Sequence, residues 1–411
     1  MQRYRCDDKF ENKRPYETDV SGSMKGEIKV KKNELILYFF LVLIIAPAQA
    51  FAEIMPEKLT VEKMEKADPH RLYLSDLNLG NVIDGRIHVL DGNNYNYLGL
   101  ISTGMFGVNS LSRDSSKMFV ATTYYTKRNR GDRFDQFEVY RTDDLTLELE
   151  IEIPAKHAQA LPYKGTITSS FDDKFVFIQN ATPASSVTII NMKTKKFSDE
   201  ISTPGCWIIL PARSKNSQFS TLCGDGTLMT VTLDTNGQEK SKIRSAKLFN
   251  PDKDPLFVQA ESIGDVYYFT SFHGQIYEIN VGGAKAELLK TWSLLKDSDK
   301  AEGWRPGGYQ LLAVHEESRR LYIAMHDEGK EGSHKYPAKE IWSFDIDSKA
   351  RIGRISGGNT IAMTLTKEKD PSLYAYDGIE AKFHKYSTMP VMKKESMSAP
   401  VGQFAGLVES H

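Results

Sequence analysis

The chain has 411 residues, of which 40% are hydrophobic and 26% charged. These proportions are typical of a folded soluble protein and exclude a collagen, a coiled coil and a largely disordered chain. The 53 Lys and Arg residues nearly balance the 54 Asp and Glu residues, for a net charge of −1. Composition therefore gives no reason to expect nucleic acid as a partner. Three cysteines are too few for a disulfide-rich scaffold or an iron–sulfur protein.

An apolar run near the start of the chain predicts a signal peptide. Residues 35–45 read LILYFFLVLII, without a charge, and this run is much shorter than the roughly 20 residues that a membrane-spanning helix needs. Basic residues precede it, and two A-x-A cleavage sites follow within residues 48–52. We therefore expect residues 1–52 to be a cleaved signal-peptide region, with Met24 as a candidate true start, and no stable membrane anchor after cleavage. A buried helix or an uncleaved anchor is the alternative.

Pairs of short β-strand patterns repeat along the rest of the chain. Each pair has a first run such as 320–326 (RLYIAMH) and a second run such as 340–345 (EIWSFD). Strong turn signals, Asp84-Gly85 among them, join several pairs. Seven such pairs follow one another, and their first runs begin 44 to 57 residues apart. This spacing is typical of the four-stranded blades of a β-propeller.

The repeat predicts an all-β fold over residues 70–411, a seven-bladed β-propeller of four-stranded antiparallel blades. Residues 53–69 are expected to form an N-terminal arm. No amphipathic helix of 10–15 residues lies between the strands, which argues against a doubly wound α/β fold. Two β-sandwiches are the alternative, but they would not need a near-constant spacing. The segment 400–408 (PVGQFAGLV) is compatible with a strand and is expected to complete a blade begun by the N-terminal strand.

Cleavage of the predicted signal peptide removes one cysteine and leaves Cys206 and Cys223. An even pair in an exported, oxidising compartment predicts one disulfide, which stabilises by about 3 kcal/mol in the chain-entropy model. A redox or metal pair has little support, because the spacing is not C-x-x-C and no histidine lies between the two cysteines.

No self-contained active site is apparent in the sequence. Phosphate-binding-loop, H-E-x-x-H, G-x-S-x-G and C-x-x-C-H motifs are all missing, so we expect no catalytic residue, cofactor or metal in this chain. His326 and His334 flank a charged, glycine-containing stretch, which we interpret as a loop at the mouth of a blade rather than a metal site. The segment 303–309 (GWRPGGY) combines Trp, Arg and Tyr, residues enriched at protein–protein hot spots. The alternative for it is a rigid turn with its aromatic rings in the core.

Five segments resemble the heavy subunit of the quinoprotein amine dehydrogenases, the family of methylamine and aromatic amine dehydrogenase. The resemblance covers about residues 68 to 385, and its longer segments look more like the aromatic amine branch. The segments are 205–207 (GCW), 223–226 (CGDG), 292–295 (WSLL), 304–309 (WRPGGY) and 325–342 (MHDEGKEGSHKYPAKEIW).

The resemblance implies a periplasmic enzyme of two heavy and two light subunits. In this family the light subunit carries both the tryptophan tryptophylquinone and the catalytic base. A primary amine is deaminated oxidatively to aldehyde and ammonia, and the electrons pass to a cupredoxin, amicyanin or azurin. This chain would supply the docking frame and part of the substrate entrance; which amine is used is left open. The alternative function is a non-catalytic periplasmic β-propeller that binds a protein or a small ligand.

The resemblance also suggests which residues are functional. Phe106, in the segment 102–107 (STGMFG), resembles the family's heavy-chain Phe at the mouth of the substrate channel; packing between blades is the alternative. The residues expected at the light-subunit interface are Trp304, Arg305, Tyr309, His326 and His334.

Overall fold

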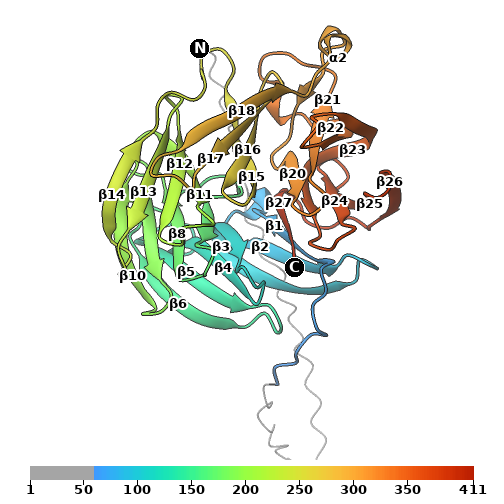
Figure 1. Ribbon diagram of the computed structural model, residues 1–411. Coiled ribbons are helices and arrows are strands. Elements are labelled where there is room, and N and C mark those ends of the chain that lie inside the picture. Colours follow the sequence, from blue (N-terminus) through green and yellow to red (C-terminus); the bar gives the residue numbers. More distant parts are fainter. Residues whose placement is uncertain (1–59) are drawn as a thin grey trace, which may run out of the picture. The chain divides into compact units, whose positions relative to one another are not determined.

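The computed structural model describes residues 60–411 of the chain (Figure 1). The predicted signal-peptide region 1–52, Met24 and residues 53–59 of the predicted arm lie outside the described residues. Residues 60–69 form neither helix nor strand. They lie against a turn of the first sheet, where the backbone N–H of Met64 donates to the carbonyl of Asp143 at 2.8 Å and Lys63 pairs with the Asp143 carboxylate at 2.9 Å.

The described residues are mostly antiparallel β-strands, as the repeat predicts. The first sheet has the order β27-β1-β2-β3-β4-β5-β6. Its strands are β1 (Arg71–Asp76), β2 (Gly85–Asp91), β3 (Tyr97–Leu111), β4 (Lys117–Tyr125), β5 (Arg133–Arg141), β6 (Leu147–Ile153) and β27 (Ala405–Ser410).

Three four-stranded sheets follow in chain order. They comprise β7 (Ile167–Ser169), β8 (Phe175–Asn180), β9 (Ser186–Asn191) and β10 (Lys196–Ser202); β11 (Cys206–Pro211), β12 (Gln218–Cys223), β13 (Leu228–Leu233) and β14 (Glu239–Arg244); and β15 (Leu256–Ile263), β16 (Val266–Ser271), β17 (Gln275–Asn280) and β18 (Glu287–Ser293).

The last sheet has eight strands, with the order β19-β21-β22-β23-β24-β25-β26 and β20 paired to β21. Its strands are β19 (Arg305–Pro306), β20 (Leu312–His315), β21 (Arg320–His326), β22 (Ala338–Asp345), β23 (Arg351–Leu365), β24 (Ser372–Asp377), β25 (Lys382–Ser387) and β26 (Lys393–Met397). The helical turns among the described residues are η1 (Leu79–Asn81), α2 (Asp297–Ala301) and η2 (Ser333–Lys335). Among residues 60–411, no helix is long and apolar enough to cross a membrane.

Two long strands explain why the first and last sheets exceed four strands. The first part of β3 pairs with β2, and its second part, after a bulge between Met105 and Val108, pairs with β4. The strand β23 pairs with β22 and β24 in the same way. Each long strand is therefore the outer strand of one four-stranded group and the inner strand of the next.

The C-terminal strand pairs with the first strand of the fold, so the expected closure is confirmed. In the antiparallel register Leu72 lies opposite Ser410 and Asp76 opposite Ala405. Asp76 also fixes the segment that precedes β27, because its carboxylate accepts hydrogen bonds from the backbone N–H groups of Gln403 at 2.6 Å and Phe404 at 2.9 Å. A strand from the far end of the chain thus becomes an inner strand of the first sheet.

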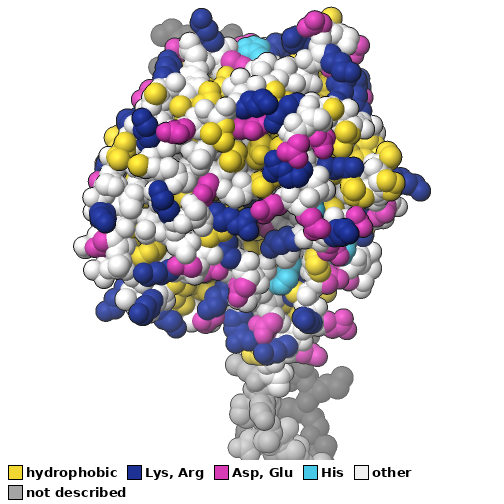
Figure 2. Space-filling model, in the orientation of Figure 1, with side chains coloured by type: hydrophobic (Ala, Val, Ile, Leu, Met, Phe, Trp, Pro, Cys, Tyr) yellow, Lys and Arg dark blue, Asp and Glu magenta, His cyan; other side chains and the backbone are white. Residues whose placement is uncertain are grey.

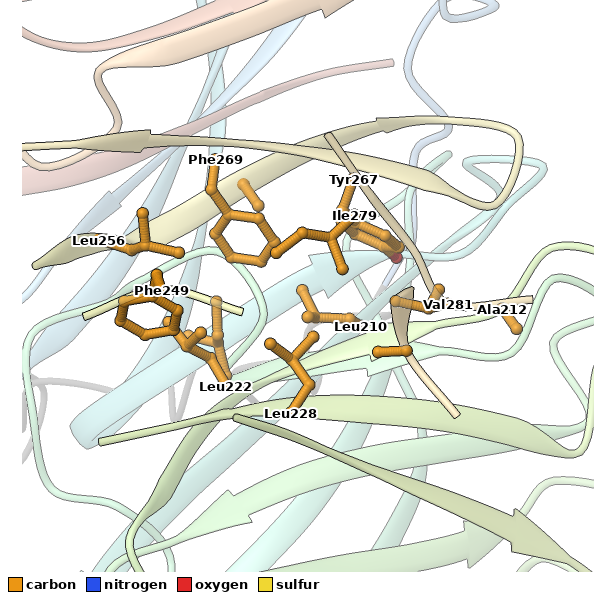
Figure 3. Close-up of a cluster of buried hydrophobic side chains, with 13 residues drawn as sticks. Leu210, Ala212, Leu222, Leu228, Phe249, Leu256, Tyr267, Phe269, Ile279 and Val281 are labelled. Atoms are coloured by element: carbon orange, nitrogen blue, oxygen red, sulfur yellow. The ribbon is translucent and has the colours of Figure 1, made fainter. Parts of the chain in front are cut away.

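The hydrophobic core lies between successive sheets rather than within one sheet. Figure 3 shows one cluster, in which Leu210 and Leu228 of the β11–β14 sheet face Phe269 and Ile279 of the β15–β18 sheet. Both faces of the middle strands are covered by neighbouring sheets, so β1, β8 and β12 are buried at every residue. Full burial of each large apolar side chain contributes about 1.5–3 kcal/mol, which makes these contacts the main attraction between sheets.

The predicted disulfide is present in the β11–β14 sheet. Cys206 begins β11 and Cys223 ends β12, and the two residues lie directly opposite each other in the antiparallel register. The bond therefore joins the two inner strands of that sheet at one end.

Candidate functional site at the connector face

The antiparallel order places the longest connections at one end of the inner strands. Within each four-stranded group, the link that enters the innermost strand and the link between the second and third strands emerge at the same end. The inner strands are neighbours in the series β3, β7, β11, β15 and β20, so their entry links gather there. We call this end the connector face and define it by residues 104–107, 154–163, 250–255, 294–311 and 327–337.

A hollow of about 560 Å³ lies on the connector face, above β15 and β20. Its walls carry the aromatic rings of Tyr163, Tyr309, Phe257 and Phe272. The rings of Tyr163 and Tyr309 approach to 6.4 Å between centroids. The remaining lining is mixed. It includes the apolar residues Pro251, Pro255, Leu256 and Val258, and residues of both charge signs, with Asp252, Lys253, His273, Glu331, His334 and Lys335. A concave aromatic surface with a charged rim is typical of a binding site for a protein or an organic ligand.

A pair of glycines sets the position of Tyr309. A side chain at Gly307 would collide with the His326 ring, 2.6 Å from its Cβ position, and Gly308 has a φ of +124° that other residues rarely adopt. The backbone N–H of Gly308 donates to the carbonyl of His334 at 3.0 Å, and that of Tyr309 donates to Ile361 at 2.8 Å. The turn is therefore rigid, and it presents the Tyr309 ring, over which the Lys335 ammonium lies at 5.7 Å.

Trp304 lies in the core and not on the connector surface. Its side chain is only 4% exposed, and its indole N–H donates to Glu302 at 2.9 Å. The Arg354 guanidinium stacks at 4.7 Å on the rings of both Trp304 and Trp342. This burial corresponds to the alternative interpretation, a rigid turn with aromatic side chains in the core, and leaves little of the Trp304 ring for a partner to contact.

The other predicted interface residues divide between core and surface. His326 is 3% exposed, and neither of its ring nitrogens has a hydrogen-bond partner among the described residues. Burial lowers the pKa of His326, so the ring is neutral at neutral pH. Arg305 is half-buried and stacks at 5.0 Å on Phe272, a wall of the hollow. His334 is exposed and lines the hollow beside Tyr309.

Phe106 lies at the connector face but outside the hollow. It is part of the bulge in β3, it is half-buried, and its own φ of 53° is left-handed. Gly104 has a left-handed φ of 59°, and the Cβ of any other residue there would lie 2.7 Å from the Tyr124 ring. The sharp turn therefore requires glycine at this position. The bulge thus gives Phe106 an orientation that a regular strand would not. Its role at a substrate channel stays a prediction.

The chain matches a known family over most of its length. A model of the methylamine dehydrogenase heavy chain (MADH) family aligns with residues 68–398. The chain belongs to this family. The methylamine dehydrogenase heavy chain of Methylophilus methylotrophus is 28% identical over 319 residues, covering 75% of this chain and 76% of the relative. That of Paracoccus versutus is 24% identical over 324 residues, covering 78% and 74%.

Solved structures similar to this chain support its fold. The periplasmic gluconolactonase PpgL of Pseudomonas aeruginosa superposes with a TM-score of 0.58 at 12% identity, over 82% of this chain and 98% of that one. The β-propeller domain of Cps50 (Swd1) from Myceliophteria thermophila superposes with a TM-score of 0.50 at 10% identity, over 78% and 96%. Identities this low bear on the fold alone, which is that of a β-propeller.

Several residues of the connector-face hollow were not predicted from the sequence. Tyr163, Phe257, Phe272, His273 and Lys335 line the hollow, yet they come from strand β15 and from three separate links between strands. The sequence feature that could have identified some of them is an aromatic residue at or next to the end of a predicted strand. No group of three or more His, Cys, Asp or Glu side chains arranged to hold a metal occurs within residues 60–411.

Proposed function

We propose that this chain is the heavy subunit of a periplasmic, tryptophan tryptophylquinone-dependent amine dehydrogenase that deaminates primary amines to aldehyde and ammonia. The quinone is on a light subunit, two light and two heavy chains form the complex, and a cupredoxin such as amicyanin or azurin takes the electrons. The observation that carries the proposal is the family match. It spans the sheets and also the loops of the connector face, residues 303–309 and 327–337.

The same proposal includes a closed ring of seven blades. The buried hydrophobic residues fall into seven clusters, each shared by two successive four-stranded groups. One of these clusters joins Leu74 of β1 to Tyr374 of β24, which links the first group to the last. Splitting β3 and β23 at their bulges divides the strands into seven groups, as the repeat spacing predicts.

The arrangement of tryptophans supports a quinone on another chain. A tryptophan tryptophylquinone is built from two neighbouring tryptophans. In this chain the pair that comes nearest is Trp304 and Trp342, with 5.1 Å between their ring centroids. Both rings are buried, at 4% and 0% exposure, and Arg354 covers them. An amine could not reach a carbonyl formed there, so these residues do not fit an open quinone.

The chain's own residues then act by binding and orientation. The aromatic hollow offers Tyr163, Tyr309 and Phe272 to an apolar projection of the light subunit, while His334 and Lys335 form a polar rim. Phe106 contributes to the wall of the entrance from the neighbouring β3 bulge. A protein held by such a surface excludes water from its buried centre, which strengthens polar contacts with the substrate.

Purification of the native complex tests the proposal directly. We expect this chain to co-purify with a small, cysteine-rich subunit that shows quinone absorbance, and the complex to oxidise methylamine, tyramine or phenylethylamine with a cupredoxin as acceptor. The chain alone should fold and show neither property. Amine oxidation by the isolated chain would contradict the proposal, and so would a native chain that purifies without any small subunit and binds another ligand instead.

Tyr309→Ala provides a sharper test of the docking surface. Loss of the ring from the centre of the hollow should weaken light-subunit binding about tenfold or more, because central aromatic residues dominate interface energies. Phe197→Ala is a matched control, since Phe197 lies on the outer strand β10 and is 40% exposed. Equal affinities of the two variants, measured by titration with light subunit, would place the interface elsewhere.

A further inference from the structure

A second hollow lies among the inner strands, mostly towards the ends that are opposite the connector face. It has a volume of about 270 Å³ and is lined where β3, β23 and β27 finish and where β7 begins. We call it the axial funnel and define it by residues 109–113, 164–168, 364–367 and 407–410. None of these residues belongs to the hollow on the connector face.

Three cationic side chains from different strands line the axial funnel: Arg113, Lys164 and Lys367. Lys164 is neutralised by Glu261, with 2.6 Å between its Nζ and the carboxylate. The Arg113 guanidinium donates to backbone carbonyls, including that of Ser169, and stacks at 4.1 Å on Phe171. Arg113 is thus held in place by neutral groups and keeps its full charge for the funnel.

Of the three cations, Lys367 is the one most available to bind an anion. Its Nζ donates to the hydroxyl of Ser115 at 3.0 Å, and no carboxylate within residues 60–411 pairs with it at 4 Å or less. Burial lowers the pKa of Lys367, and the nearby charges of Lys164 and Arg113 lower it further, against the opposing effect of Glu409. The Lys367 ammonium therefore has a carboxylate nearby, that of Glu409, but no direct ion pair among the described residues.

Glu409 is the one carboxylate on the funnel wall that forms no ion pair in the described part of the chain. Its oxygens accept the backbone N–H of Leu111 at 3.3 Å and the amide of Asn109 at 3.1 Å. Burial raises the pKa of Glu409, so its negative charge is the least favourable one at the site. The rim carboxylates of Asp114 and Asp173 already accept hydrogen bonds from serine hydroxyls.

We propose that the axial funnel binds a small oxyanion, with Lys367 and Arg113 as its cationic contacts. The lining itself holds three cations and one carboxylate, Glu409. Of the carboxylates beside it, Glu261 is paired with Lys164, and Asp114 and Asp173 accept hydrogen bonds from serine hydroxyls. The hydroxyls of Ser110, Thr168 and Thr364 add neutral polar groups to the lining. Arg113 and Lys367 are both exposed, so an anion can reach them from solvent. This inference does not depend on amine oxidation.

The test is calorimetric titration of the full chain, in its native complex, with inorganic phosphate, sulfate and succinate at constant ionic strength set by sodium chloride. We expect saturable binding of at least one oxyanion. A preference for phosphate or sulfate identifies an inorganic ligand, and a preference for succinate identifies a carboxylate metabolite. Heat that does not saturate, or that chloride reproduces, would overturn the proposal.

Two variants with opposite expected effects keep the test independent of folding. Lys367→Met should weaken binding tenfold or more, whereas Glu409→Gln should tighten it several-fold because a repelling charge is removed from the wall. Lys290→Met is the control, since Lys290 is exposed on the outer strand β18. Weaker binding in Glu409→Gln, or equal losses in Lys367→Met and Lys290→Met, would show that the funnel is not an oxyanion site.

Discussion

The connector-face hollow and the axial funnel are both built around the inner strands, yet their chemistry differs. Long links between sheets build the hollow, and its walls are aromatic, with Tyr309 and Phe272 at the centre. Strand ends build the funnel, and its walls are charged, with Lys367 and Glu409 facing the same space. A larger, aromatic hollow fits a protein surface, and a smaller, charged one fits a small ion.

The difference follows from how each end of the strands is made. At the connector face, links such as 154–163 and 294–311 are long enough to carry their own turns and side chains over the sheet edges. At the funnel the side chains come from the last residues of the inner strands and from the residues next to the strands, so their spacing is set by the sheets themselves. Figure 2 shows charges of both signs interspersed over the visible outer surface, without a large region of one sign. Local geometry, rather than overall charge, therefore distinguishes the two sites.

Both hollows depend on ring closure by β27, so breaking the closure should have the largest effect. Burial acts to raise the pKa of Asp76, but hydrogen bonds from His88 and from the backbone N–H groups of Asn78, Gln403 and Phe404 lower it to about 2. Asp76→Ala would leave these buried donors without an acceptor. We expect a loss of about 2–4 kcal/mol in unfolding free energy, measured by urea denaturation at pH 7, and weaker binding at both hollows.

The pH dependence of Asp76 has a definite sign. Its folded pKa of about 2 lies below the ordinary value of 3.8. The stabilisation is therefore complete above about pH 4 and is lost as the pH falls towards 2, by roughly 2 kcal/mol. Asp76→Asn should remove this part of the acid sensitivity. Asp347→Asn is the control, because Asp347 is 65% exposed in a surface pair with Arg319; equal stability curves for both variants would contradict the role of Asp76 in closure.

A change at Gly308 should separate the two hollows. An alanine there would have to adopt a φ of +124°, with its Cβ 3.0 Å from the carbonyl of Ile361. We expect a cost of about 1–3 kcal/mol, a displaced Tyr309 and weaker light-subunit binding, with oxyanion binding unchanged. Gly224→Ala is the control, since its Cβ would lie 3.7 Å from the nearest atom and its φ is not positive. Parallel losses at both hollows in Gly308→Ala would show that the sites are not independent.

The smallest expected effect concerns Phe106, which lies near neither hollow's centre. If its ring borders the substrate entrance, Phe106→Ala changes the contact with the amine's side chain and not with its nitrogen. Apolar contacts of this size are worth roughly 1–3 kcal/mol. The ratio of kcat/KM for methylamine and phenylethylamine should then change by about tenfold. A lower melting temperature with an unchanged ratio would mean that Phe106 only packs between sheets.

Most of the fold could be predicted from the sequence because strand and turn signals are local. Runs such as 320–326 and 340–345 predict hairpins, and their regular recurrence predicts four-stranded antiparallel units. The Cys206–Cys223 bond was also predictable, since only two cysteines follow the predicted signal peptide. The site was predicted less well. The Trp-Arg-Tyr segment indicated an interface, but composition alone could not tell that Trp304 is buried under Arg354 while Tyr309 faces the hollow.

By itself the sequence determined the β-strand repeat, the disulfide pair and the family resemblance, because each depends on residue type at short or countable spacing. The tertiary structure alone decided which side chains share a surface. Tyr163 and Tyr309 are separated by more than a hundred residues, as are Arg113 and Lys367, and each pair meets only because ring closure brings inner strands from different sheets together. Long-range contacts of this kind depend on the arrangement of whole sheets, which no local pattern of residues specifies.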